Sequence, residues 1–289
     1  MCIRDSCDGE RIVAIFSSND IFCLDLNGNL LWCRGLGRDY PNASNNLGMS
    51  SSLVLADGVV IAQVESESDA FVAGLDAQSG VNRWKLERPR KPNWSSPVLI
   101  ETNQVAVQSA HGVTVIEPAT GKTIWEYLDG TATIPSSTPA AGVLFVPSRG
   151  ITALQPAQPG EPAKPLWRSG QLRPGTASPV VAGNRIFALS DSGVLTCGDV
   201  TNGSRLWQLR LKGEFSATPV AIGSVLYAVN EKGLVQVIDT AKPEGEIVSE
   251  LDLAEKILST PSVSDTAIYF RSSAHLWRFG KSSRSEPRS

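Results

Sequence analysis

The chain has 289 residues, 42% of them hydrophobic, and a formal net charge of −3 at pH 7, which is the composition of a globular protein that can bury a core. Its basic residues are scattered, so no concentrated positive surface is expected to bind a phosphate backbone, and nucleic acid is excluded as a partner. No apolar run approaches the roughly 20 residues that a helix needs to cross a bilayer, so no transmembrane segment is expected.

The first six residues, "MCIRDS", resemble the translation of a transposon end used in sequencing libraries. We therefore expect residues 1–6 to be a scar that should be excluded from reasoning about the fold. Under this interpretation residues 7–280 form one domain and residues 281–289 form a polar tail. The native N-terminus and its signal are then expected upstream of residue 7.

The segment "DLNGN" predicts a hairpin with a two-residue turn at Asn27-Gly28. This turn pairs Cys23 with Trp32, which places the thiols of Cys23 and Cys33 on opposite faces of the sheet. A disulfide between them is not favoured, although it stays open as an alternative. No Cys-x-x-Cys occurs, and the only histidines lie far apart in sequence, so a zinc site has no support.

Two markers repeat with one period along the rest of the chain. Short Ser/Thr-Pro steps precede apolar runs, with prolines 97, 139, 179, 219 and 261 at intervals of 42, 40, 40 and 42 residues. The tryptophans keep the same period, because Trp84, Trp125, Trp167 and Trp207 follow one another at intervals of 41, 42 and 40 residues. Two independent markers with one period indicate a true structural repeat.

Each period contains four short apolar or alternating stretches separated by turn residues. Between residues 177 and 211 these are "ASPVVAG", "NRIFALS", "GVLTCGDV" and "SRLWQLRL", which read as four strands. Four antiparallel strands that repeat about every 40 residues are typical of a β-propeller blade. The predicted fold is therefore all-β, with the Ser/Thr-Pro strand nearest the propeller axis, seven readable repeats and the first and last of them incomplete.

A third pattern lies between the third and fourth strands of three repeats, where an acidic residue precedes glycine by four positions and tryptophan follows glycine by four. The acid is expected to accept hydrogen bonds from the turn, and the glycine to supply a positive φ. The tryptophan is expected to pack between neighbouring blades, where burial of about 200 Å² gives roughly 5 kcal/mol gross per copy at ~25 cal/mol/Å². The structural docking residues predicted in this way are Asp76, Gly80, Trp84, Glu117, Gly121, Trp125, Trp167, Asp199, Gly203 and Trp207.

Four repeats depart from this pattern. The fourth carries a proline-rich insertion, "QPAQPGEPAKPLW", and the sixth, "IDTAKPEGEIVSEL", is expected to replace the tryptophan with an aliphatic residue. The last repeat ends at "AHLWRFGK" without a fourth strand, and the first lacks a Ser/Thr-Pro strand.

The combination of Asp-x-x-x-Gly-x-x-x-Trp with Ser/Thr-Pro every forty-odd residues resembles the PQQ-like, tryptophan-docking β-propeller repeat family. This family includes quinoprotein dehydrogenases and BamB-like proteins of the bacterial envelope, and the resemblance covers nearly the whole chain. It implies eight blades in the full-length protein, with the ring closed by N-terminal strands.

The resemblance to quinoprotein dehydrogenases does not extend to their site. Those enzymes need adjacent cysteines, calcium-binding carboxylates and an Asp base, whereas this chain has no adjacent cysteines and its repeat acids fall on turns. We therefore expect no catalytic residue, no metal site and no cofactor, PQQ included. The alternative is a PQQ-dependent dehydrogenase whose site lies in a missing N-terminal part.

The connections that follow fourth strands gather on one face of a propeller, where binding residues are expected. Residues 34–49 and 87–95 form two such connections and combine basic and aromatic side chains, a composition typical of hot spots. The predicted partner-binding residues are Arg38, Tyr40, Arg88, Arg90, Lys91 and Trp94. The alternative is that the charges are solvated and Trp94 packs at the top of an inner strand.

The favoured function is a non-enzymatic scaffold that holds a protein or peptide in the periplasm or cell envelope of a bacterium. The resemblance is compatible with membrane attachment through a lipid anchor upstream of residue 7. The identity of the partner is not encoded in these residues.

Overall fold

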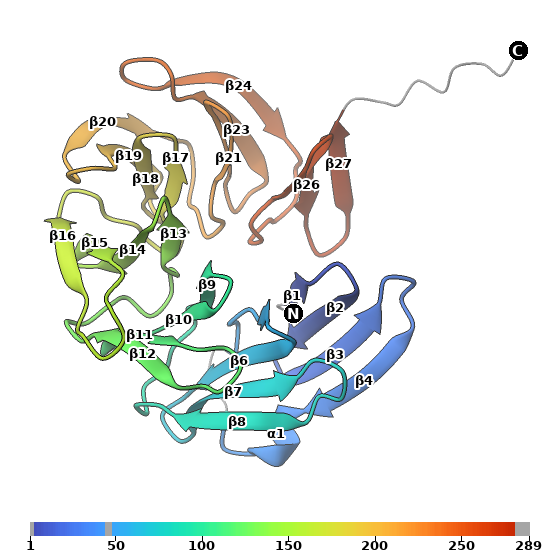
Figure 1. Ribbon diagram of the computed structural model, residues 1–289. Coiled ribbons are helices and arrows are strands. Elements are labelled where there is room, and N and C mark those ends of the chain that lie inside the picture. Colours follow the sequence, from blue (N-terminus) through green and yellow to red (C-terminus); the bar gives the residue numbers. More distant parts are fainter. Residues whose placement is uncertain (1–2, 44–47, 281–289) are drawn as a thin grey trace, which may run out of the picture. The chain divides into compact units, whose positions relative to one another are not determined.

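The computed structural model describes residues 3–43 and 48–280, and it is an all-β protein with one short helix. The chain divides into two compact units, residues 1–169 and 170–289, each of which is a series of antiparallel sheets. In every sheet the strands follow sequence order, from the first strand at one edge to the last at the other (Figure 1). These sheets are the blades of a β-propeller, so the predicted fold class is confirmed. No helix among the described residues is long and apolar enough to span a membrane.

The first unit contains four blades of four strands. The strands of the first blade are β1 (Ile3–Cys7), β2 (Arg11–Phe16), β3 (Asp20–Asp25) and β4 (Leu30–Gly35), and helix α1 (Leu36–Asp39) follows them. Those of the second are β5 (Val54–Ala56), β6 (Val59–Glu65), β7 (Ala70–Asp76) and β8 (Asn82–Glu87). Those of the third are β9 (Val98–Glu101), β10 (Gln104–Ser109), β11 (Gly112–Ile116) and β12 (Thr123–Tyr127). Those of the fourth are β13 (Thr138–Ala140), β14 (Val143–Ser148), β15 (Gly150–Gln155) and β16 (Lys164–Ser169).

The second unit contains two blades of four strands and one of three. The first of these blades has β17 (Val180–Ala182), β18 (Arg185–Leu189), β19 (Val194–Asp199) and β20 (Arg205–Arg210). The next has β21 (Val220–Ile222), β22 (Val225–Val229), β23 (Leu234–Asp239) and β24 (Glu246–Asp252). The last has β25 (Ser262–Ser264), β26 (Ala267–Arg271) and β27 (Leu276–Gly280), and the described residues contain no fourth strand for it.

The burial pattern reflects the stacking of blades. Every residue of β6 and β11 is buried, whereas each fourth strand has at least one exposed residue. A strand that is covered on both faces has no solvent side, so the second and third strands read as continuous apolar runs. The cores of the two units are formed by these middle strands.

The first strands of successive blades lie side by side within each unit. Contacts join β1 to β5, β5 to β9, and β9 to β13 in the first unit, and β17 to β21 in the second. Hydroxyl groups of the Ser/Thr-Pro steps and their neighbours link these strands, because each accepts a hydrogen bond from a backbone amide of the preceding blade. The pairs are Ser52 N to Ser96 Oγ (2.8 Å), Ser96 N to Ser136 Oγ (2.9 Å), Ser178 N to Thr218 Oγ1 (3.0 Å) and Thr218 N to Thr260 Oγ1 (3.2 Å).

The first blade is more complete than the sequence analysis expected. Residues 3–7 form β1, which pairs with β2 in the register Cys7 to Ile12. Backbone pairing of this kind needs no particular side chains, so the strand forms whatever the origin of residues 1–6. In the same blade Cys23 pairs with Trp32, as predicted. Cys23 is buried, Cys33 is exposed and both are free thiols.

Trp32 and Trp84 dock on the hairpin of the next blade in their unit. The indole Nε1 of Trp32 donates to the carbonyl oxygen of Ala77 (3.0 Å), and that of Trp84 donates to Pro118 (2.8 Å). Glycine is required beneath each ring, because a Cβ on Gly80 would lie 2.7 Å from Trp32 and a Cβ on Gly121 would lie 2.5 Å from Trp84. The φ angles at Gly80, Gly121 and Gly203 are +71°, +72° and +70°, which favour glycine as well.

Trp125 is 1% exposed, and the proline-rich insertion of the fourth repeat explains why it is buried so completely. Ala157 and Ala163 of the insertion pack in the same core cluster. The insertion also pairs with the free edge of β12, where Gly160 N donates to the carbonyl oxygen of Ile124 (2.8 Å) and Ala163 N to that of Glu126 (2.9 Å). A parallel bridge joins Glu126 to Pro162 between these bonds. The insertion therefore acts as an added strand on the third blade.

The sixth repeat differs from the sequence-based expectation at one position. Cys197 pairs with Trp207 in the fifth repeat, and the equivalent pair in the sixth is Val237 with Ser249. Ser249 therefore takes the position of the tryptophan. The aliphatic residue Val248 lies one residue earlier, in the β-bulge that precedes the tryptophan position in each complete blade. Counting along the sequence missed this because the turn is longer, with five residues ("TAKPE") rather than three between Asp239 and Gly245.

The acid of the second repeat is held by its hairpin. Asp76 Oδ1 accepts hydrogen bonds from Gln78 N (3.0 Å) and Ser79 N (2.9 Å), and Oδ2 accepts from Arg83 Nη2 (2.7 Å). The hydrogen bonds from Arg83 and Ser79 lower the pKa of Asp76 to about 2. Asp199 of the fifth repeat behaves similarly. Its Oδ1 accepts a hydrogen bond from Thr201 N (2.7 Å), and the hydrogen bonds from Thr201 lower the pKa of Asp199.

We expect an NMR titration of the Asp76 carboxyl carbon to give a pKa of about 2 and Arg83→Ala to raise it toward the ordinary value of 3.8. Since the folded-state pKa is lowered, the carboxylate stabilises the fold above pH 3.8 and loses this effect as the pH falls through 2. Lys85→Ala is the control, because Lys85 pairs with Glu87 instead. A normal pKa for Asp76 in the wild-type protein would contradict the hairpin contacts.

Candidate functional site

Three connections of the first unit meet at Trp94. They follow the fourth strands β4, β8 and β12 and comprise residues 36–43 with 48–53, residues 88–97 and residues 128–137, which together we call the loop face. The indole Nε1 of Trp94 donates to the carbonyl oxygen of Gly48 (2.9 Å), and its backbone N donates to that of Thr133 (2.7 Å). Trp94 is half-buried. It therefore joins all three connections while it keeps part of its ring at the surface.

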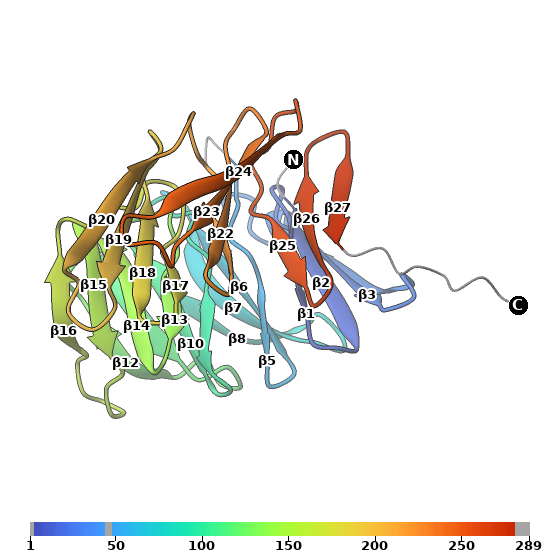
Figure 2. The same ribbon diagram turned by 90° about the horizontal axis from the view of Figure 1, so that it is seen from above.

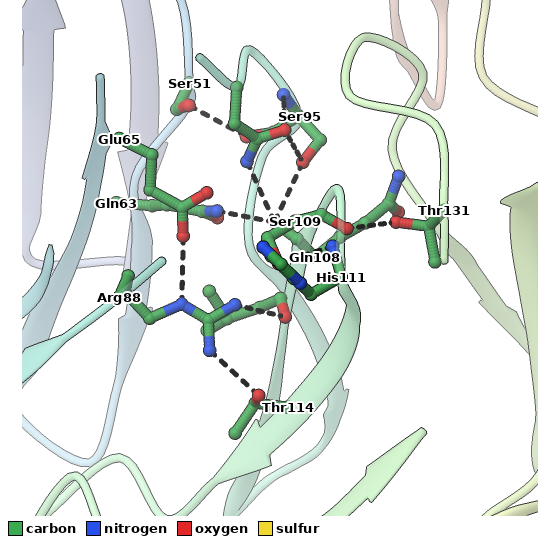
Figure 3. Close-up of polar contacts among 12 residues, drawn as sticks. Ser51, Gln63, Glu65, Arg88, Ser95, Gln108, Ser109, His111, Thr114 and Thr131 are labelled. Atoms are coloured by element: carbon green, nitrogen blue, oxygen red, sulfur yellow. Dashed lines mark hydrogen bonds and ion pairs between the residues drawn. The ribbon is translucent and has the colours of Figure 1, made fainter. Parts of the chain in front are cut away.

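A buried glutamine, Gln108, holds two of these connections, residues 88–97 and 128–137 (Figure 3). Gln108 on β10 donates through Nε2 to the carbonyl oxygens of Ala132 (2.6 Å) and Pro135 (2.9 Å), and its Oε1 accepts from Ser137 Oγ (2.6 Å). Its own carbonyl oxygen accepts from Gln63 Nε2 (2.6 Å) and from Asn93 Nδ2 (2.8 Å). A buried loop needs such partners, because its backbone groups have no strand to pair with.

Arg88 lies beneath the loop face in a buried ion pair. Its Nε is 2.9 Å from Glu65 Oε1, and the side chains of Arg88 and Glu65 are only 6% and 1% exposed. Arg88 Nη1 donates to Thr114 Oγ1 (2.8 Å) (Figure 3). Thr114 in turn donates to Glu126 Oε1 (3.0 Å). Removal from water raises the pKa of Glu65 despite the opposing effect of Arg88.

A cavity of about 190 Å³ opens beside this ion pair, between β8 and the third blade. Its lining residues are Leu86, Glu87, Arg88, Pro89, Ser109, His111, Gly112, Thr114, Thr123, Glu126 and Leu128. The Thr114 hydroxyl is committed to hydrogen bonds with Arg88 and Glu126. The arrangement offers hydrogen-bonding groups to a small polar side chain.

The structure separates the six predicted partner-binding residues into different environments. Arg38, Arg90 and Lys91 are exposed on the loop face. Tyr40 is half-buried against Phe71, with ring centroids 4.4 Å apart. The Arg88 side chain is buried and lines the cavity. Trp94 joins the three connections.

Sequence reasoning missed the residues that organise the loop face. Gln63 and Gln108 are the important omissions, and each lies in a mostly apolar strand that is fully or almost fully buried. A polar amide inside such a strand is a signal that could have identified them, since a buried amide has to find hydrogen-bond partners.

The second unit has a larger cavity, of about 590 Å³, at the ends of its strands. Its lining residues are Gly213, Glu214, Glu231, Lys232, Ala254, Glu255 and Lys256. Glu231 accepts a hydrogen bond from Ser216, and Glu255 accepts from Ser272 and contacts His275 Nδ1 (2.6 Å). No group of three or more His, Cys, Asp or Glu residues that could hold a metal ion occurs in the part of the chain that the structure describes.

The blades, their docked tryptophans and the joined connections define the class of protein as a tryptophan-docked β-propeller with a preorganised loop face. A family model described as "Outer membrane protein assembly factor BamB" matches residues 3–134 and 150–243, which are 226 of the 289 residues. The chain belongs to this family.

Comparison with solved structures agrees with this fold. BamB from Moraxella catarrhalis superposes with a TM-score of 0.74 at 18% sequence identity, over 95% of this chain and 80% of that chain. The computationally designed protein Ika8 superposes with a TM-score of 0.60 at 12% identity, over 96% of each chain. Identities this low show the fold alone. No curated protein matches the chain.

Proposed function

We propose that the chain is a non-enzymatic β-propeller scaffold that holds a protein or peptide partner in the bacterial cell envelope. The family to which it belongs is described as an outer membrane protein assembly factor, which favours both a protein partner and an envelope location. The observation that carries the proposal is the joining of three connections by Trp94. A loop face that is already ordered loses less entropy when a partner binds.

The exposed charges of the loop face then affect approach more than affinity. Arg38, Arg90 and Lys91 are solvated, and exposed charges mainly increase the rate of association and its dependence on salt. Trp94 supplies the aromatic surface at the centre of the same face, where tryptophan is a common hot-spot residue. PQQ takes no part in this function.

We expect a photoreactive residue at position 90 to crosslink to one defined envelope protein, identified by mass spectrometry. In a second protein the probe is at position 38, and Arg90 and Lys91 are both replaced by glutamate. This charge reversal should lower the yield of the crosslink and make the yield less sensitive to salt. The control probe is at position 120, an exposed residue in the β11–β12 turn at the opposite end of the third blade. Capture of the partner from position 120 and not from positions 38 or 90 would refute the loop face as the binding surface.

A parallel titration with PQQ and calcium separates the scaffold from the quinoprotein alternative. We expect no shift in quinone absorbance and no dye-linked alcohol oxidation. Saturable PQQ binding at micromolar concentration would favour the quinoprotein instead.

A further inference from the structure

The fourth strand of the sixth blade, β24, is unlike the other fourth strands. It has seven residues where the others have five or six, and it contains Glu246, Glu250 and Asp252 with no basic residue, a net charge of −3. The fourth strands of the other five complete blades carry net charges between −1 and +2. Lysine and proline are the residues that usually block a strand edge, and β24 has neither.

The outer edge of β24 is unpaired within the described residues, because β24 is the last strand of its sheet (Figures 1 and 2). Its apolar side chains Val248 and Leu251 are 51% and 42% exposed. Two lysines approach its acids, Lys212 at 2.7 Å from Glu250 and Lys242 at 3.8 Å from Glu246. Both lysines are more than half exposed, and exposed pairs of this kind are weak enough for another cation to replace.

The third blade shows how a fourth strand of this architecture accepts another strand. There the inserted segment donates backbone hydrogen bonds to the carbonyl oxygens of Ile124 and Glu126, in parallel orientation. Ile124 is the bulged residue that precedes Trp125, and Val248 is the bulged residue that precedes Ser249. The equivalent acceptors on β24 are therefore the carbonyl oxygens of Val248 and Glu250.

We propose that β24 is a docking edge for an extended protein segment in which basic and apolar residues alternate. The segment adds as a strand, its amides donate to the carbonyl oxygens of Val248 and Glu250, and its basic side chains pair with the acids of β24. Alternation follows from strand geometry, because neighbouring side chains point to opposite faces. The cavity at the end of β24 is lined by three acids, Glu214, Glu231 and Glu255, and by two lysines, so it adds only a small negative charge beside this edge. This edge is independent of the loop face.

A fluorescent ten-residue peptide of alternating lysine and valine tests the proposal with purified protein. We expect saturable binding by fluorescence anisotropy. Binding to the Val248→Lys variant should be about tenfold weaker, because the positive charge added to the edge of β24 repels the lysines of the peptide. The matched control is Leu206→Lys, because Leu206 is the bulged residue of β20 and is 49% exposed, as Val248 is 51% exposed. Leu206→Lys should leave the affinity unchanged, and an alternating glutamate-valine peptide should not bind.

Backbone pairing is separated from simple charge attraction by N-methylation of the peptide. Methylation of one alternate set of amides removes the donors that face β24, whereas methylation of the other set removes none of them, so one peptide should lose binding and the other should keep it. Equal binding of the two methylated peptides would overturn strand addition. Equal effects of Val248→Lys and Leu206→Lys, or binding of the acidic peptide, would overturn the assignment to β24.

Discussion

Trp125→Ala is expected to lower the free energy of unfolding by about 3–5 kcal/mol, the usual cost of deleting a large buried aromatic side chain. Trp125 is 1% exposed and packs with Val113, Val115 and Leu144. Its removal leaves a cavity that the surrounding strands cannot fill, because the proline-rich insertion is tied by its own backbone hydrogen bonds to β12. Chemical denaturation followed by circular dichroism measures the loss.

Leu166→Ala is the control for this experiment. Leu166 also lies on a fourth strand of the first unit but is 51% exposed, so its truncation should change the free energy of unfolding by no more than about 0.5 kcal/mol. A similar small effect for Trp125→Ala would show that tryptophan docking does not stabilise the blades.

Arg88→Met is expected to cost a similar amount, about 3–5 kcal/mol, for an electrostatic reason. The substitution keeps the apolar stem but removes the cation beside Glu65, and a buried carboxylate without its partner charge is strongly destabilising. Arg90→Met is the matched control on the same connection, because Arg90 is exposed and should contribute within about 0.5 kcal/mol. Adding Glu65→Gln to Arg88→Met should recover part of the loss, since it removes the unpaired charge.

The same pair gives a pH dependence of defined sign. Burial raises the pKa of Glu65 above its ordinary value of 4.5, so the folded state favours the protonated acid. The contribution of Glu65 to stability is therefore largest at low pH and falls as the pH rises through the raised pKa. We expect the Arg88→Met deficit to be smaller at pH 4.5 than at pH 7.5. A deficit that does not change with pH would mean that packing, rather than charge, accounts for the effect.

The local parts of this structure could be predicted from the sequence. The four-residue spacing from acid to glycine to tryptophan led to the hairpins and the positive φ of Gly80 and Gly121, because a tight turn restricts both residue type and spacing. The forty-residue period led to the blades, and the Asn27-Gly28 turn led to the pairing of Cys23 with Trp32. Each of these features depends on residues close together in the chain.

The sequence by itself therefore determined the blade, its hairpins and the class of fold, since these are repeated and local. Only the tertiary structure decided which polar residues of the connections are buried. Arg88 and Arg90 are two residues apart in the same connection, yet Arg88 pairs with Glu65 inside the unit and Arg90 is exposed. The difference arises because Glu65, Val107 and Thr114 come from three different strands, β6, β10 and β11, 19 to 26 residues away in sequence. Only packing brings their oxygens to the Arg88 guanidinium.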